Sequence, residues 1–428
     1  MKKFILCIIL SNILLLNAQT IKGINGDKNW LKSWTNFKPK LTDYNEPNEM
    51  LIGVIDKNTT LSKKNIYLIV GKVYVANNAV LTIEPGTLIS GDFDTRGMLI
   101  VTKGSKIIAN GDESNPIVFT SNKSASERKP GDWGGVVIMG ESNVNKFGNI
   151  GYLNLNLESK YNIYGGDNSK SSSGILNYVR IEFAGGKNRG VYDACSLMLA
   201  GVGSGTKIDF VQISYSKVDS FEFLGGQINT NNLVSFRASK DDFDFTAGIQ
   251  AKINNSIAVR NSYFSDSGKC RAFEIDSYDL VSNADLTKKL TKVIASNITL
   301  INEDVENTTD GLVREAIFIK ENAYLEMSNS VISGFNQCVL LDANLKMNFD
   351  NLDKVKLQNI LLNNCKSFIN SETVENNKQL ESWFNNVKFN IECSKVANSN
   401  LFMELDFKNL PNLQLKNNNI LTSRLANN

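Results

Sequence analysis

The chain has 428 residues, and its 46 basic and 44 acidic side chains leave a net charge of only +2. This balance gives no electrostatic reason to expect a nucleic acid or an anionic membrane as the partner. The sequence contains no histidine, which excludes Ser-His-Asp and Cys-His nucleophiles and histidine-bound zinc. Any enzyme of this composition would depend on carboxylates, Lys, Arg, Tyr or metal-bound water.

The first 18 residues have the features of a secretory signal peptide. Two lysines precede an apolar run, and Ala18 is a small residue at a suitable cleavage point. The apolar run is short for a membrane span, which makes a retained anchor the weaker alternative. We expect cleavage near Ala18 and an extracytoplasmic mature chain without a transmembrane segment, either secreted, periplasmic or associated with the outer membrane.

The rest of the chain divides into three parts. Residues 19–49 are polar and include Trp30 and Trp34, and we interpret them as an N-terminal cap over an otherwise open strand edge. Residues 50–395 contain many short apolar segments that end in Gly, Asn, Asp or Pro, which is typical of strands separated by tight turns. The Asn- and Leu-rich residues 396–428 are expected to form a C-terminal cap or tail.

A short aromatic and acidic segment repeats in the middle of the chain. The sequence V-D-S-F-E-F-L-G-G at 218–226 is followed by D-D-F-D-F-T-A-G at 241–248 and by F-E-I-D at 273–276. A period in the twenties indicates a solenoid, and the apolar-polar alternation indicates that its coils are strands. The sequence therefore predicts one all-β domain, a right-handed parallel β-helix with capped ends. We expect the polar segment 141–173 to leave the solenoid as an excursion.

Several motifs occur in a specific order between residues 50 and 280. These are V-L-T-I-E-P-G-T-L-I-S-G, N-P-I-V-F-T-S, G-D-W-G-G-V-V-I-M-G and Y-V-R-I-E-F-A-G-G, followed by the repeated segments above. In this order they resemble a family of secreted or cell-surface right-handed β-helix proteins common in Bacteroidetes. The resemblance implies the same fold and an extracytoplasmic location, but that family has no settled biochemical activity. Some members are labelled lipoprotein or "multidrug transporter"; this chain lacks a usable lipobox cysteine and predicted membrane spans.

The alternation also predicts an acidic ladder on the outside of the solenoid. If Phe221 and Phe223 point inward, Glu222 points outward, and the same holds for its equivalents in the next coils. Coils lie about 4.8 Å apart, and two oxygens each about 2.4 Å from one cation span that distance, so stacked carboxylates suit Ca²⁺. The candidate metal ligands are Asp219, Glu222, Asp241, Asp242, Asp244, Glu274 and Asp276.

Stacked carboxylates repel one another by roughly 1 kcal/mol per pair in water, and something must offset this repulsion. Three interpretations remain open: a salt-bridge lattice with basic neighbours, a Ca²⁺- or glycan-binding patch, and a catalytic site. In the catalytic version, Glu222 and Asp244 are the carboxyl pair of a glycoside hydrolase. Alternatively, Arg237 or Lys240 is the base of a Ca²⁺-dependent polysaccharide lyase, which is an argument by fold analogy.

We favour a secreted, non-catalytic binding or scaffold protein with an outward acidic patch that could hold Ca²⁺. Its expected partner is a glycan or a cell-surface protein, and the carbohydrate-active enzyme is the alternative.

The repeated glycines and asparagines are expected to have structural roles at the turns between strands. The Gly pair at 225–226 suits a corner with positive φ, and Asn297, Asn329, Asn359 and Asn385 suit turns or stacked amides.

Three cysteines, Cys338, Cys365 and Cys393, recur at coil-like spacings of 27 and 28 residues. This spacing would stack them on consecutive coils. An oxidising compartment would permit a disulfide among them. A ladder of free thiols is equally compatible with the spacing, because strands in register do not guarantee disulfide geometry.

Overall fold

The computed structural model describes most of the chain after the predicted signal peptide. The described residues are 22–26, 28–186, 194–265, 270–303, 313, 315–345, 352–373, 377–416 and 423–424. The proposed cleavage point near Ala18 lies outside them. Within these ranges, no helix combines the length and the apolar character that a bilayer crossing requires.

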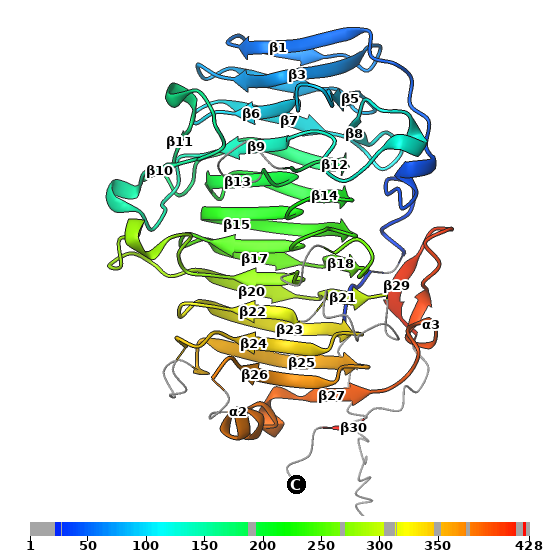
Figure 1. Ribbon diagram of the computed structural model, residues 1–428, viewed down its shortest axis with the longest axis vertical. Coiled ribbons are helices and arrows are strands. Elements are labelled where there is room, and N and C mark those ends of the chain that lie inside the picture. Colours follow the sequence, from blue (N-terminus) through cyan, green and yellow to red (C-terminus); the bar gives the residue numbers. More distant parts are fainter. Residues whose placement is uncertain are drawn as a thin grey trace, which may run out of the picture.

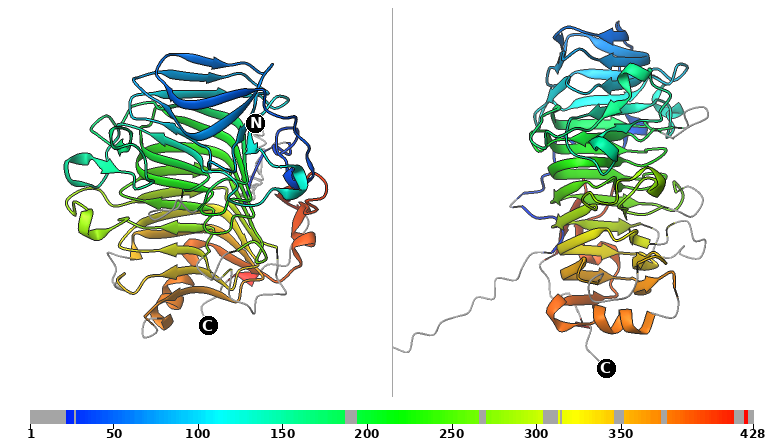
Figure 2. Two further views of the ribbon diagram at one scale, coloured as in Figure 1. Left: turned by 45° about the horizontal axis from the view of Figure 1, so that its top comes forward. Right: turned by 90° about the vertical axis from the view of Figure 1, so that its left-hand side faces the viewer.

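The chain winds into a parallel β-helix whose coils stack along the long axis of the molecule (Figure 1; Figure 2). This confirms the predicted all-β solenoid. Each coil contributes to three parallel ladders, and long strands bend from one ladder into the next. The ladder that carries the acidic residues is called the site face. It consists of β6 (Met98–Val101), β9 (Gly135–Met139), β13 (Leu197–Val202), the start of β15 (Phe221–Phe236), β16 (Phe243–Thr246), β19 (Phe273–Ile275), β22 (Glu315–Ile319), β24 (Gln337–Leu341) and β26 (Ser367–Ser371).

The other two ladders share several long strands. The middle face consists of β2 (Thr59–Leu61), β4 (Val80–Ile83), β7 (Lys106–Asn110), β17 (Gln250–Asn254), β20 (Lys292–Ser296), and parts of β12 (Gly174–Glu182), β14 (Lys207–Ser214), β15, β23 (Tyr324–Ser333) and β25 (Val355–Asn363). The third face combines the remaining parts of those strands with the first parts of β1 (Glu49–Ile55) and β3 (Ile66–Val75), and with β5 (Leu88–Gly91), β8 (Ile117–Ser121), β18 (Ile257–Arg260), β21 (Thr299–Asn302) and β27 (Ile391–Ser394). The ends of β1 and β3 bend onto the site face, where β3 pairs with β6.

Asparagines form the corner between the middle and third faces in consecutive coils. Asn297, Asn329, Asn359 and Asn390 have φ values between 48° and 57°, a left-handed conformation that Asn tolerates better than most residues. The Asn359 amide donates to Asn329 Oδ1 at 2.7 Å, and the Asn390 amide donates to Asn359 Oδ1 at 2.9 Å. The predicted turn and stacked-amide role is therefore confirmed for Asn297, Asn329 and Asn359.

Phenylalanine rings fill the interior behind the acidic ladder. Phe221 stacks on Phe243 with ring centroids 5.2 Å apart, Phe223 stacks on Phe245 at 4.8 Å, and Phe273 continues the column. All five rings are buried. The inward direction predicted from the alternation is confirmed, and it requires the residues between the rings to point outward.

Both terminal segments lie along the third face rather than over the first coil (Figure 1; Figure 2). Near the start of the described chain, Gly23 N donates to Asn329 O at 2.8 Å, and Trp34 packs edge-on against Tyr178 and Phe210 at 5.8 Å. This placement differs from the interpretation of residues 19–49 as a cap. The third face carries apolar side chains on its outside, and the tryptophans bury them, whereas Met50 in β1 remains 67% exposed.

The C-terminal segment packs beside the N-terminal one on the third face. It contains α3 (Asn398–Leu401) and a hairpin of β28 (Phe402–Glu404) and β29 (Asn412–Leu415). Phe407 contacts Phe37, with ring centroids 5.4 Å apart. The last coil is covered by α2 (Asn377–Phe384), whose Leu380 and Phe384 enter the core, and β30 (Ser423–Arg424) pairs with β27.

Two excursions leave the solenoid on the side of the site face. The first, residues 140–173, contains η3 (Phe147–Asn149), β10 (Gly151–Tyr152), η4 (Ser159–Tyr161) and β11 (Ile163–Tyr164). As predicted, it departs from the coils, and its Val144 and Leu153 join an apolar cluster with Val137 and Met198 of the site face. The second, residues 276–291, contains η5 (Val281–Asn283). The remaining short helices are η1 (Pro39–Leu41), η2 (Ala125–Glu127) and η7 (Val387–Phe389).

The three regularly spaced cysteines do not form a disulfide. Cys338, Cys365 and Cys393 are free thiols, and Cys365 lies close enough to hydrogen-bond with Cys338. Burial raises the pKa of the Cys393 thiol to about 12. Of the two arrangements that the spacing left open, the structure shows the thiol ladder.

Candidate functional site

Three acidic residues occupy successive rungs of the site face. The strand register pairs Glu222 with Asp244, and Asp244 with Glu274. Met198 is paired with Glu222 on one side, and Phe318 is paired with Glu274 on the other. The sequence repeat therefore predicted the stacking of these rungs correctly, and the acidic ladder lies between two apolar rungs.

The carboxylates are more enclosed than an outward patch implies. Glu222 and Asp244 are half-buried, while Asp219 and Asp241 at the start of the same coils are 2% and 0% exposed. The Cys195 thiol donates to Glu222 Oε2 at 2.9 Å and lies 3.4 Å from Asp219 Oδ2. The expectation of an open acidic surface is therefore wrong, because other side chains cover most of the cluster.

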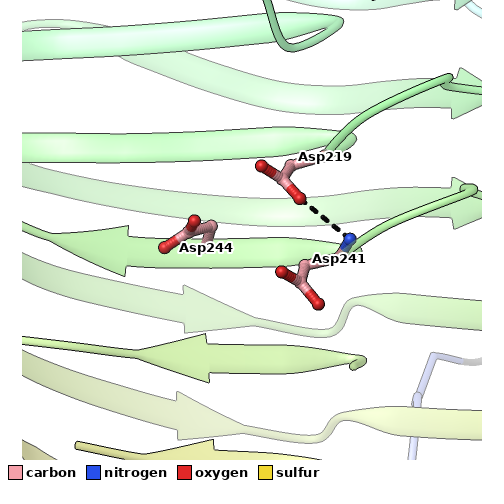
Figure 3. A group of neighbouring side chains, drawn as sticks. All are labelled: Asp219, Asp241 and Asp244. Atoms are coloured by element: carbon pink, nitrogen blue, oxygen red, sulfur yellow. Dashed lines mark hydrogen bonds between the residues drawn. The ribbon is translucent and has the colours of Figure 1, made fainter. Parts of the chain in front are cut away.

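Asp219, Asp241 and Asp244 lie close together on two adjacent coils (Figure 3). Each offers a carboxylate oxygen, and these three oxygens lie within 4.8 Å of one another. Backbone donors fix two of the carboxylates. Asp219 Oδ1 accepts from Asp241 N at 2.9 Å, and Asp241 Oδ1 accepts from Arg271 N at 2.7 Å. We call these three residues the carboxylate cluster.

Lys240 is the cation nearest to the carboxylate cluster. Its Nζ lies 3.0 Å from Asp219 Oδ2 and 3.6 Å from Asp241 Oδ2. Asp241 Oδ2 is buried and accepts no hydrogen bond from the described residues. One ammonium group thus faces four carboxyl groups, those of the cluster and Glu222, so the site carries an excess of acid.

Burial and mutual repulsion shift the ionisation of these acids. Burial, reinforced by the charge of Asp219, raises the pKa of Glu222 to about 7 and also raises the pKa of Asp244. Burial and the nearby Glu274 and Asp219 raise the pKa of Asp241. Burial alone would lower the pKa of Lys240, but the surrounding carboxylates outweigh it and raise that pKa. The protein therefore favours either protonated acids or an added cation at this site.

Glu274 and Asp276 form ion pairs with a different set of basic residues. Glu274 accepts from Arg271 Nη1 at 2.7 Å and from the Lys320 ammonium, which also lies 3.5 Å from Asp276. Burial opposes ionisation of Glu274, but Lys320 and Arg271 outweigh it and hold its pKa below the usual value. Burial raises the pKa of Asp276 despite Lys320, so only Glu274 of this pair has full compensation from basic neighbours.

Two residues assigned to the site from the sequence lie elsewhere. Asp242 forms a fully buried ion pair with Arg260 at 2.7 Å inside the solenoid, because adjacent side chains at the corner diverge and Asp241 takes the direction of the site. Arg237 forms two bonds with Glu303, at 2.8 and 2.9 Å, on the third-face side. Asp242 as a metal ligand and Arg237 as a base are both corrected by this placement.

Cys195 was missed as a neighbour of the site, whereas Arg271 was expected among the basic neighbours of the acidic ladder. The register that aligns Leu197 with Phe221, and Phe221 with Phe243, places Cys195, Asp219, Asp241 and Arg271 at equivalent positions in successive coils. A full alignment of the coils, rather than of the acidic segments alone, would have found Cys195.

The fold and site define a parallel β-helix protein with a carboxylate cluster on one face. Residues 53–400 match the family described as pectate-lyase-like β-helix domains, and the chain belongs to that family. Neither the curated proteins nor the solved structures include a significant match to the chain.

Proposed function

We propose that the chain is an extracytoplasmic, non-catalytic binding or scaffold protein whose carboxylate cluster holds a Ca²⁺ ion. Membership of the pectate-lyase-like β-helix family is compatible with binding, scaffold and enzymatic roles. The extracytoplasmic location is inferred from the features of residues 1–18. The observation that carries the Ca²⁺ assignment is that three carboxylate oxygens lie within 4.8 Å of one another. In addition, Asp241 Oδ2 is buried and accepts no hydrogen bond from the described residues.

The donor set suits a hard divalent cation. Ca²⁺ takes oxygen ligands at about 2.3–2.6 Å, and carboxylates are among its preferred ligands. The ammonium group of Lys240 lies against Asp219 and Asp241, but its side chain is 43% exposed and its stem is flexible. A divalent ion would displace this ammonium toward solvent and neutralise more of the excess acid, with Glu222 and water available to complete the ligand set.

Enclosure favours binding over catalysis at the cluster itself. Asp219 and Asp241 are almost completely buried, so a polysaccharide chain has little access to their carboxyl groups. Their arrangement instead suits an ion that ties neighbouring coils together. The ion would stabilise the site face, and the partner, a glycan or a cell-surface protein, would bind elsewhere on the stiffened solenoid.

One observation favours a second candidate, a carbohydrate-active enzyme. Glu222 is half-buried and has a pKa of about 7, which suits a general acid near neutral pH. Its neighbour Asp244 would be the second carboxyl group of a glycosidase. In this version, turnover of a glycan would be lost in Glu222→Gln.

Thermal unfolding in Ca²⁺ and in EDTA tests the proposed metal site. A ligand at about 100 times its dissociation constant stabilises the native state by about 2.7 kcal/mol, so Ca²⁺ should raise the melting temperature. Asp244→Asn should abolish the increase. Asp209→Asn is the matched control, because Asp209 is also a half-buried carboxylate with a raised pKa, of about 6, but lies on the middle face.

The same samples separate the two functions. A Ca²⁺-dependent increase without turnover of uronate-rich or neutral glycans supports the binding protein. Turnover that disappears in Glu222→Gln supports the enzyme. An equal Ca²⁺ response in Asp244→Asn and in the wild type would refute the metal assignment.

A further inference from the structure

The first coil of the solenoid is open, whereas the last coil is covered (Figure 1). Within the described residues, β1 pairs only with β3 and β2 pairs only with β4, so neither strand has a neighbour on its outer edge. At the other end, α2 covers the last coil and places Leu380 and Phe384 in the core. The molecule therefore presents an unpaired strand edge at the end where its coils begin.

Apolar side chains follow this open edge. Leu51 and Ile55 point inward and are only partly buried against the core, while Met50, Ile52 and Val54 are 67%, 62% and 41% exposed. Proteins usually protect an edge strand with Lys, with Pro or with a covering segment. The sequence of β1, E-M-L-I-G-V-I, contains neither Lys nor Pro. Its composition therefore indicates a strand that is covered in the functional protein.

Neither end of the described chain lies near the first coil. The Lys22 ammonium pairs with Glu392 of β27 at 2.7 Å, and β30 pairs with the same strand. The third-face ladder runs from β27 back to β1, and at about 4.8 Å per coil this separation is roughly 50 Å. A cover for the first coil is therefore expected from another molecule.

A second copy of the chain presents a matching edge. Gly53 forms the corner between the third face and the site face, opposite the middle face that carries β2. A twofold axis through Gly53 and the middle of β2 places each of these strands antiparallel to the same strand of the second copy. The unpaired N–H and C=O groups of the two edges then satisfy one another.

The conformation of Gly53 leaves this corner accessible. Its φ is +72°, and a Cβ added to it would meet no atom within 4 Å. Glycines with positive φ also form corners in later coils. Gly225 and Gly226 have φ of +65° and +93°, which confirms the corner predicted there from the sequence.

The register about Gly53 keeps the inner and outer sides of the two edges aligned. It brings Leu51 of one copy opposite Ile55 of the other on the inner side, where both extend the core. It brings Ile52 opposite Val54 on the outer side. Residues directly opposite each other in an antiparallel pair point to the same side, so apolar side chains meet apolar side chains on both sides.

The same register is electrostatically complementary. It brings Glu49 of one copy opposite Lys57 of the other, and both side chains are exposed in the single chain. The twofold axis produces this contact twice. Opposite charges on directly paired residues stabilise an antiparallel pair of strands.

We propose that two copies of this chain bind head to head through their first coils, with β1 of one copy antiparallel to β1 of the other about Gly53. Because α2 covers the opposite end, the association closes at two copies and does not extend into a fibre. The dimer goes beyond the proposed Ca²⁺ site and does not depend on it, because the carboxylate cluster lies on later coils.

Sedimentation equilibrium of the purified protein in EDTA measures the association. The wild type should have twice the mass of the single chain at tens of micromolar. Ile52→Lys should raise the dissociation constant at least about tenfold, because it brings like charges together in the apolar interface. Leu286→Lys is the matched control, because Leu286 is 63% exposed but lies on the second excursion, and it should leave the dissociation constant unchanged.

An exchange of charges tests the register. Glu49→Lys and Lys57→Glu should each raise the dissociation constant at least about threefold, because each places like charges opposite each other on both sides of the axis. The double variant restores opposite charges and should return to within about twofold of the wild type. A role of either residue in folding alone would not produce this recovery.

Three results would overturn the proposal. If the wild type stays monomeric at tens of micromolar, a second copy does not cover the first coil. If Ile52→Lys associates as tightly as the wild type, the dimer forms through another surface. If the double charge variant associates as weakly as the two single variants, the antiparallel pairing about Gly53 is wrong.

Discussion

At the scale of single residues, the number of counter-ions beside each buried acid decides the direction of its pKa shift. Asp219, Asp241 and Asp244 share one ammonium, that of Lys240, whereas Glu274 has two basic partners. The repeated acidic segments look alike in sequence. Their pKa values nevertheless move in opposite directions, because only one of them has enough counter-charge.

The raised pKa of Glu222 predicts how stability depends on pH. Its folded value of about 7 lies above the ordinary 4.5, so the folded state binds more protons than the unfolded state between these values. The free energy of unfolding in EDTA should therefore fall, by roughly 1–3 kcal/mol, as pH rises through this window. Urea denaturation at pH 5 and pH 7.5 measures the change.

The comparison with Glu222→Gln isolates this residue from other buried acids. Its free energy of unfolding should fall less than that of the wild type over the same window. Saturating Ca²⁺ should also reduce the fall, because the ion stabilises the ionised carboxylates. An equal fall in the variant and the wild type would contradict the assigned pKa.

The buried pair of Asp242 and Arg260 has a structural role. Arg260 Nη1 donates to Asp242 at 2.7 Å and to Arg271 O at 2.8 Å, and both members of the pair are fully buried. Arg260→Met should lower the free energy of unfolding by about 3–5 kcal/mol, because it leaves a buried carboxylate without its partner.

A second variant tests the cause of that loss. Adding Asp242→Leu to Arg260→Met should recover part of the stability, since replacing both members of a buried ion pair with apolar residues costs less than removing one. Chemical denaturation of both variants provides the measurement. If the double variant is less stable than Arg260→Met alone, the unpaired charge does not explain the loss.

At the scale of secondary-structure elements, the repeat predicted which residues stack, but not what covers them. Alternation placed Phe221 inside and Glu222 outside, and both placements are correct. Residues 140–173 pack on the apolar part of the site face, and Cys195 and Lys240 contact Glu222 and Asp219. No local pattern at Glu222 reveals these contacts. Long-range packing therefore explains why the open acidic patch expected from the sequence is enclosed.

Side-chain directions were also hard to predict at the corners of the coils, where the chain turns from one face of the solenoid to the next. Arg237 and Arg260 are 23 residues apart, which is the spacing of one coil. Arg237 has φ of 58° and turns toward Glu303, whereas Arg260 ends β18 and points into the solenoid. The period identifies equivalent coils, but the side-chain direction at a corner depends on backbone conformation that spacing does not encode.

The asparagine corner allows a test of backbone conformation at this scale. Asn359 has φ of 57° and hydrogen-bonds with the asparagines of both adjacent coils. Asn359→Ala should lower the free energy of unfolding by about 1–3 kcal/mol, through left-handed strain and lost amide bonds. Asn359→Gly should cost less, because glycine tolerates the conformation. Equal losses in the two variants would show that backbone strain makes no contribution.

At the scale of the whole molecule, the two ends of the described chain stabilise the same face. The N-terminal segment and the C-terminal hairpin lie side by side over the third face (Figure 1). Phe402 and Leu413 of the hairpin are fully buried there. The third face is therefore an internal surface of the protein, and the proposed ion lies on the site face.

Removing residues 396–428 tests this arrangement. The truncated chain should lose at least about 3 kcal/mol of unfolding free energy, given the burial of Phe402 and Leu413 alone, and should bind a hydrophobic dye. Leu413→Ala should show a smaller loss in the same direction. Unchanged stability and no dye binding after truncation would contradict a structural role for the hairpin.

The carboxylate cluster as a Ca²⁺ site is the central claim, and a crystal structure of the protein grown with Ca²⁺ tests it most directly. An anomalous difference map should show one peak between Asp219, Asp241 and Asp244, with Lys240 Nζ moved away from Asp219. A map without that peak, in which the Lys240 ammonium still bridges Asp219 and Asp241 at millimolar Ca²⁺, would contradict the claim.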